Sequence, residues 1–117
     1  MREEMRMHEV DKPDLFELYK QTLEMCGVYL LHENDETIGY CIYEEFDIGV
    51  HSFLHAGCLE AFRASGLISH DKLDRSLLLR SKVLALQTSG EWGIEHFRAS
   101  PRWREIMALS DEIKSMQ

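Results

Sequence analysis

Lysine and arginine are scarce in the first half of this 117-residue chain, and their scarcity limits what the chain can bind. Residues 1–59 hold four basic and thirteen acidic residues, whereas residues 60–117 hold nine basic and eight acidic ones. The formal net charge of the whole chain is −8. Because the binding of phosphates requires clustered lysine and arginine, this composition disfavours nucleic acid as a partner.

Cysteine is sparse, and long apolar runs are absent. The three cysteines, Cys26, Cys41 and Cys58, cannot all pair within one chain, and their number is low for a small domain that depends on disulfides. Apolar runs such as Val28–Leu31 are too short to cross a bilayer, and no apolar stretch typical of a signal peptide follows Met1–Glu4. We therefore expect a cytoplasmic protein with reduced thiols that does not enter a membrane.

The sequence also lacks the usual signatures of an enzymatic site. Its seven glycines are scattered, and none forms a phosphate-binding loop with a following lysine and serine or threonine. No Gly-x-Ser-x-Gly motif marks a nucleophilic serine. Cys41 lies between bulky neighbours without an adjacent positive charge, which is typical of a packing residue. We expect no bound cofactor and no enzymatic activity.

What the sequence does contain is helical periodicity, because apolar residues recur every three or four positions in four segments. The last segment is the clearest, since Ser100 can cap a helix that has Pro101 at its first position. The expected helices run from Pro13 to Gly27, from about Ser52 to Ala64, from Ser69 to Thr88, and from Pro101 to the end of the chain.

Residues 28–46 fit two structures. Their β-branched and aromatic residues around a polar centre are typical of a β-hairpin. Ile38, Ile42 and Phe46 instead repeat every four residues, as in a helix, although Gly39 costs a helix about 1 kcal/mol relative to alanine. We favour the helix. The prediction is one all-α domain over residues 1–117, a bundle of four to five helices with residues 1–12 as a flexible N-terminal segment; the alternative is an α+β fold with a short hairpin in 28–46.

His51, His55 and Cys58 are the strongest candidates for a metal site. At spacings of four and three residues they would share one face of the helix expected from about Ser52 to Ala64, where two imidazoles can bind one metal. The residue after the first histidine is Ser52 rather than the glutamate that a zinc protease needs as its base. We favour local packing roles for the three, and a small metal- or thiol-dependent enzyme is the alternative function.

A run of acidic residues interleaved with tyrosines is the strongest candidate for a binding surface. Such a surface can dock on a basic protein, because charge steers the approach and aromatic side chains anchor the complex. A solvated acidic surface without a partner and a self-associating adaptor are the alternatives. The candidate partner-binding residues are Glu33, Asp35, Glu36, Tyr40, Tyr43, Glu44, Glu45 and Asp47.

Tryptophans and arginines gather near the C-terminal end. Arginine stacked on tryptophan can bind RNA bases. Trp92 and Trp103 are also the largest apolar groups available to a small helical core, and Arg98, Arg102 and Arg104 beside them can pair with acids of the first half. We favour the core with ion pairs.

Residues 43–80 resemble small bacterial immunity proteins. The similarity lies in Tyr43–Asp47, His51–His55, Leu59, Gly66–Ile68 and Leu79–Arg80. Immunity proteins neutralise a toxin by binding it. The resemblance implies a cytoplasmic protein that sequesters a toxin, often a basic nuclease, by covering its active site or a neighbouring surface.

Overall fold

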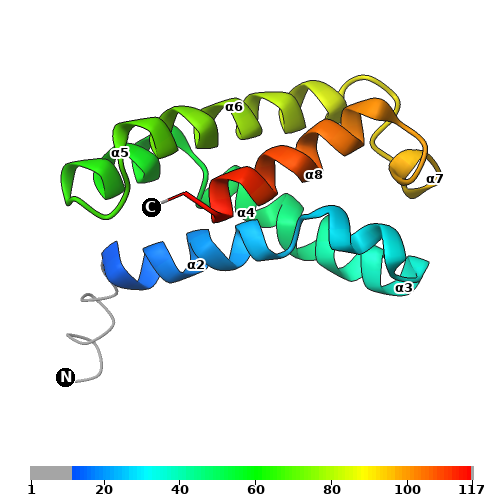
Figure 1. Ribbon diagram of the computed structural model, residues 1–117, viewed down its shortest axis with the longest axis horizontal. Helices are drawn as coiled ribbons and strands as arrows, with labels where there is room; N and C mark the ends of the chain where they lie inside the picture. The colour runs from blue at the N-terminus through cyan, green and yellow to red at the C-terminus, as the bar shows by residue number, and fades with distance from the viewer. Residues whose placement is uncertain (1–11, 117) are drawn as a thin grey trace.

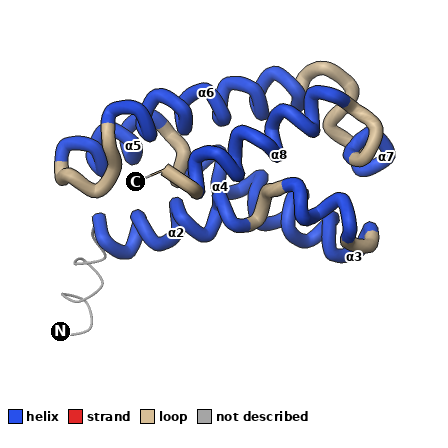
Figure 2. Tube along the Cα trace, viewed as in Figure 1, coloured by secondary structure: helices blue, strands red, loops and turns tan. Residues whose placement is uncertain are grey.

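The computed structural model describes residues 12–116 of the chain, and this part contains helices and no strand (Figure 2). The predicted all-α class is confirmed. No helix in this part is long and apolar enough to cross a membrane. The helices are α2 (Lys12–Glu24), α3 (Asp35–Ile38), α4 (Asp47–Ser52), α5 (Ala56–Ala64), α6 (His70–Gln87), α7 (Ile94–Phe97) and α8 (Pro101–Lys114), with a 3-10 helix η1 (Val28–His32) and a π-helix η2 (Gly39–Phe46).

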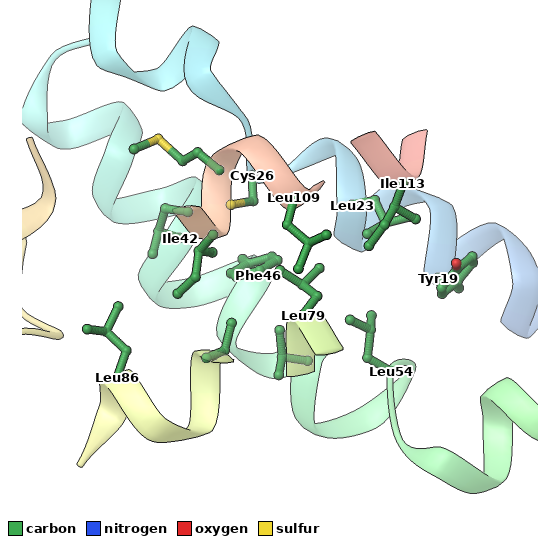
Figure 3. Close-up of a cluster of buried hydrophobic side chains, with 14 of the residues drawn as sticks. Tyr19, Leu23, Cys26, Ile42, Phe46, Leu54, Leu79, Leu86, Leu109 and Ile113 are labelled. Atoms are coloured by element: carbon green, nitrogen blue, oxygen red, sulfur yellow. The ribbon is translucent and has the colours of Figure 1, made fainter. Parts of the chain in front are cut away.

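Four longer helical segments form the bundle, and α5 and α7 lie at its two ends (Figure 1). Helix α8 lies between α6 and α2 and runs antiparallel to both. The Tyr19 hydroxyl of α2 and the Ser76 hydroxyl of α6 share a buried hydrogen bond of 2.8 Å. Side chains from α2, η2, α6 and α8 meet in the core. Figure 3 shows them, among them Leu23, Ile42, Phe46, Leu79 and Leu109.

Residues 35–52 form one continuous helix made of α3, η2 and α4. The backbone stays in the right-handed helical region where one element passes into the next, including at Gly39. The Asn34 side chain caps the start of this helix by accepting the backbone N–H of Thr37 at 2.8 Å. The prediction that 28–46 is helical rather than a hairpin is confirmed, but the segment is divided: η1 ends at His32, and Glu33 and Asn34 are extended before the longer helix begins.

The π-helical stretch keeps the core side of this helix straight. Ile38, Ile42, Phe46 and Val50, each four residues apart, are all fully buried. In an ideal α-helix, side chains four residues apart drift by about 40° per step, so Val50 would lie about 120° from Ile38. A π-helix turns less per residue, because its hydrogen bonds span five residues, and it offsets this drift. The outward side of the helix is therefore a straight stripe as well.

The predicted single helix from Ser52 to Ala64 is wrong. Helix α4 ends at Ser52, and α5 begins only at Ala56. The break follows from His55, whose backbone is extended and whose Nδ1 accepts the Gly57 N–H at 3.0 Å, so that this histidine is the N-cap of α5. The helices predicted to end at Gly27 and at the chain end stop at Glu24 and Lys114. The expected flexible segment, residues 1–12, lies almost wholly outside the described residues.

Side chains of α8 hydrogen-bond to backbone carbonyls at and just after the end of α2. The Ser110 hydroxyl is fully buried and lies 3.0 Å from the Leu23 carbonyl and 2.9 Å from the Cys26 carbonyl. Lys114 Nζ donates to the same Cys26 carbonyl at 2.9 Å. The last carbonyls of a helix lack their regular partners within the helix. Helix α8 supplies both side-chain donors of the Cys26 carbonyl and adds a second donor to the Leu23 carbonyl, which also accepts the Cys26 N–H at 3.2 Å.

Substitution of Ser110 by alanine is expected to lower the free energy of unfolding by about 0.5–1.5 kcal/mol, because it removes a buried hydroxyl donor while each carbonyl keeps one other donor. Urea unfolding followed by circular dichroism measures this loss. The exposed Ser115, whose hydroxyl bonds only to the carbonyl of Glu112 in its own helix, is the matched control, and its alanine variant is expected to unfold like the natural protein. Equal stabilities for the two variants would contradict this account of the α2 end.

Candidate functional site

The outward side of the helix formed by residues 35–52 carries the candidate site. Glu36, Tyr40, Glu44 and Ile48 lie four residues apart and are all exposed, opposite the buried stripe of the same helix. Tyr40 is 51% exposed. Glu33 and Glu45 are exposed beside this stripe. We call Glu33, Glu36, Tyr40, Glu44 and Glu45 the acidic face.

The carboxylates of the acidic face form no ion pair with any residue of the described part of the chain. Elsewhere on the surface such pairs are present, for example between Arg75 and Glu112 and between Lys20 and Glu17. Within residues 12–116, these four carboxylates thus lack a direct cationic partner.

Asp35, in contrast, is paired within the protein. Arg98 at the end of α7 lies 2.6 Å from its carboxylate and also donates to the Glu33 carbonyl at 2.5 Å. Helices α3 and α7 lie at the same end of the bundle (Figure 1). The predicted pairing of arginine with acids of the first half is confirmed for Arg98. Arg102 and Arg104 form no such pair within residues 12–116.

Tyr43 packs against the aromatic cluster and does not project outward. Its hydroxyl donates to the Trp92 carbonyl at 2.6 Å, and its ring contacts the Trp92 ring edge-on, with 5.4 Å between the ring centroids. Burial, and then the nearby charge of Glu95, raises the pKa of Tyr43, so that the hydroxyl keeps its proton. Trp103 is fully buried in the same cluster, as predicted. Tyr43 is therefore a packing residue of the fold, and the prediction that it anchors a partner directly does not fit its position.

The Asp47 carboxylate is also hydrogen-bonded within the protein, to a residue of α6. Gln87 at the end of α6 donates from Nε2 to the Asp47 carboxylate at 2.7 Å and accepts from His51 Nε2 at 3.0 Å. His51 Nε2 lies 3.6 Å from the same carboxylate. This chain of contacts joins α4 to α6. Asp47 and His51 thus have partners inside the fold.

The structure separates the three candidate metal ligands, so their predicted common helix face is wrong. His51 lies in α4, His55 uses its Nδ1 to cap α5, and the Cys58 thiol approaches the Ser52 carbonyl at 3.5 Å. The break between α4 and α5 removes the regular spacing on which a shared face depends. Among residues 12–116, no three histidine, cysteine, aspartate or glutamate side chains are arranged to hold a metal ion.

Two exposed apolar residues beside the acidic face were missed by the sequence reasoning. Ile48 is 63% exposed and continues the outward stripe, and Leu18 of α2 is 37% exposed. Both line a small depression of about 60 Å³ between α2 and the helix of residues 35–52, and Glu45 lines it as well. The signal in the sequence was the spacing, because Ile48 follows Tyr40 and Glu44 at steps of four. The pairing with Leu18 depends on how α2 packs.

The two helices approach closely at Gly49. A Cβ atom at this position would overlap the Thr22 side chain, whose hydroxyl is held by a 2.8 Å hydrogen bond to the Leu18 carbonyl. Gly49 is buried, and no larger residue fits there without a shift of α2. This contact sets the separation of the helices that line the depression.

Substitution of Gly49 by alanine is therefore expected to destabilise the protein by about 1–3 kcal/mol, although alanine normally stabilises a helix. Gly39 is the matched control, because it is helical and a Cβ there meets nothing within 4 Å. Gly39→Ala is expected to stabilise the protein by about 0.5–1 kcal/mol. Thermal unfolding of both variants measures the difference, and a stabilising effect of both substitutions would disprove the close contact at Gly49.

No family model, no curated protein and no solved structure matches the chain.

Proposed function

We propose that this chain is a non-enzymatic protein-binding domain of the cytoplasm that binds a basic protein through its acidic face. One observation carries the proposal: the exposed carboxylates of Glu33, Glu36, Glu44 and Glu45 form no ion pair among the described residues, and Glu36 and Glu44 flank the half-exposed Tyr40 on the outward stripe. Elsewhere, surface acids such as Glu17 and Glu112 pair with lysine or arginine, whereas Glu24, Glu60 and Asp71 form no such pair within residues 12–116; the acidic face differs in that its unpaired acids lie together. An unbalanced group of acids around an aromatic ring fits an intermolecular role.

The physical basis is charge steering combined with an aromatic anchor. Complementary potentials raise the rate at which two proteins meet, and the effect is strongest at low salt. A tyrosine at the centre of an interface supplies apolar area and a hydroxyl at a low cost in conformational entropy. Tyr40 lies between Glu36 and Glu44 on the outward stripe and can serve as this anchor.

We further propose that the partner is a basic toxin or nuclease and that the chain acts as an immunity protein. The resemblance to immunity proteins in residues 43–80 includes Glu44 and Glu45 of the acidic face. A nuclease that binds phosphates carries a basic surface, and a protein with opposite charge can cover it. Neutralisation would then need no chemistry, only a complex that excludes the toxin's substrate.

A pull-down from the native host tests the proposal. The tagged protein is incubated with lysate at low salt, washed at moderate salt, and the released proteins are identified by mass spectrometry. We expect a basic protein that is released by salt, because exposed charge pairs are screened. Capture of acidic or neutral proteins alone, or no released protein at all, would contradict the proposal.

A further inference from the structure

An apolar seam runs beside the acidic face. It follows the line where α2 and η1 meet the helix of residues 35–52, and its depression contains Leu18, Met25, Ile48 and Phe53. Further along the same line, the Tyr29 hydroxyl lies beside the Cys41 thiol. We define the seam by these six residues, of which Leu18, Tyr29 and Ile48 are large apolar groups exposed by 37–63%.

Carboxylates border the seam on more than one side. Glu45 lines the depression itself. At the other end of the seam, the Tyr29 hydroxyl donates to the backbone carbonyl of Glu24 at 2.6 Å, which places this exposed acid beside Tyr29. An apolar line with acids along its edges is complementary to an apolar stripe with lysine or arginine along its edges.

The dimensions of the seam favour a protein segment over a small molecule. Its depression of about 60 Å³ is far below the volume of about 300 Å³ or more that is typical of a cofactor or ligand pocket. It accepts the end of one side chain. The outward stripe from Glu36 to Ile48 spans at most about 18 Å, at a rise of about 1.5 Å per residue, which matches about three turns of a partner helix. Residues 12–116 contain no strand, so an extended peptide finds no sheet edge to join there.

We propose that this seam is the groove that receives an amphipathic basic helix of the partner, with one apolar side chain inserted beside Ile48 and Leu18 and with lysines or arginines facing the carboxylates at its edges. This inference rests on the proposed function, because it states which feature of the basic partner is recognised. Tyr40 and the acidic face then provide one wall of the groove, and α2 provides the other.

The test uses a synthetic peptide as the probe. A fluorescent peptide of about 14 residues, made of leucine and lysine in an amphipathic helical order, is titrated with the full chain and its anisotropy is measured. A second peptide has the same composition in an order that distributes leucine around the helix. We expect the ordered peptide to bind at least about tenfold more tightly than the reordered one, because only the former aligns its leucines with the seam.

Alanine variants locate the binding site. Leu18→Ala and Ile48→Ala are expected to weaken binding of the ordered peptide by about tenfold. Leu67→Ala and Leu78→Ala are the matched controls, since both leucines are similarly exposed, at 37% and 45%, but do not line the depression. Their effects are expected to stay within about twofold. Circular dichroism confirms that each variant keeps the natural helical content.

Each other outcome overturns the inference. Equal binding of both peptides would show attraction by charge alone, and equal effects of the four substitutions would place the site elsewhere. Absence of binding would exclude a basic helix as the occupant. If the chain alone dimerises and Ile48→Ala abolishes the dimer, the occupant is a second copy. The proposed function fails separately, when reversing charges on the acidic face leaves capture of the basic partner unchanged.

Discussion

Replacement of Trp103 by alanine is expected to lower the free energy of unfolding by about 3–5 kcal/mol, the largest loss we expect from a single substitution in this protein. The side chain is fully buried, and its ring stacks on the Trp92 ring with 4.8 Å between the ring centroids. The centroid of its ring also lies 4.8 Å from that of Phe97 and 6.2 Å from that of Tyr43. Its Nε1–H donates a hydrogen bond of 3.0 Å to the Glu91 carbonyl. Its removal leaves a cavity where α7, α8 and η2 meet.

Urea unfolding of Trp103→Ala and Trp92→Ala measures this effect against a control. Trp92 lies in the same cluster but is only half-buried. Trp92→Ala is therefore expected to lower the free energy of unfolding by clearly less than Trp103→Ala. Domains of this size are stable by about 5–15 kcal/mol, so Trp103→Ala is expected to remove a large part of the total. A loss below about 1 kcal/mol would show that the aromatic cluster does not hold this end of the bundle.

The double reversal Glu36→Lys and Glu44→Lys is expected to weaken binding of the basic partner by about 30-fold, mainly through a slower association. Each carboxylate lies on the outward stripe and forms no ion pair within residues 12–116. Attraction of a cationic surface is therefore replaced by repulsion at both positions. Surface plasmon resonance with the protein captured in the pull-down gives both rate constants, and the effect should shrink as salt is added.

A second double reversal, Glu60→Lys and Asp74→Lys, is the control for net charge. Both acids are exposed and lie on α5 and α6, away from the acidic face, and both double variants change the net charge from −8 to −4. This control is expected to reduce the association rate only slightly. If both double variants weaken binding equally, total charge decides the interaction and the acidic face has no special role.

The fold was predicted from the sequence wherever the local signals were strong. Ser100 and Pro101 marked the start of α8 because a serine cap followed by proline satisfies the first donors of a helix. The break before α5 was missed, because histidine is not among the usual capping residues that a sequence reveals. In residues 28–46 the composition indicated strands while the spacing indicated a helix, and the spacing was right.

The candidate site was only partly predictable, because exposure depends on contacts between distant residues. The outward positions of Glu36, Tyr40 and Glu44 follow from their spacing. The internal partners of Asp35, Tyr43 and Asp47 lie 63, 49 and 40 residues away in the sequence, so no local pattern reveals them. Local acidity thus pointed to the helix of residues 35–52, and tertiary packing decided which of its acids remain outward.

Carboxylate footprinting of the complex tests the central claim most directly. The free protein and its complex with the captured partner are labelled with a carbodiimide and an amine, and mass spectrometry reports the modification of each acid. We expect Glu36, Glu44 and Glu45 to be protected in the complex, while the exposed Glu60 and Asp74 are labelled as in the free protein. Unchanged labelling of Glu36, Glu44 and Glu45, with protection of acids on α5 or α6 instead, would contradict the assignment of the acidic face as the binding surface.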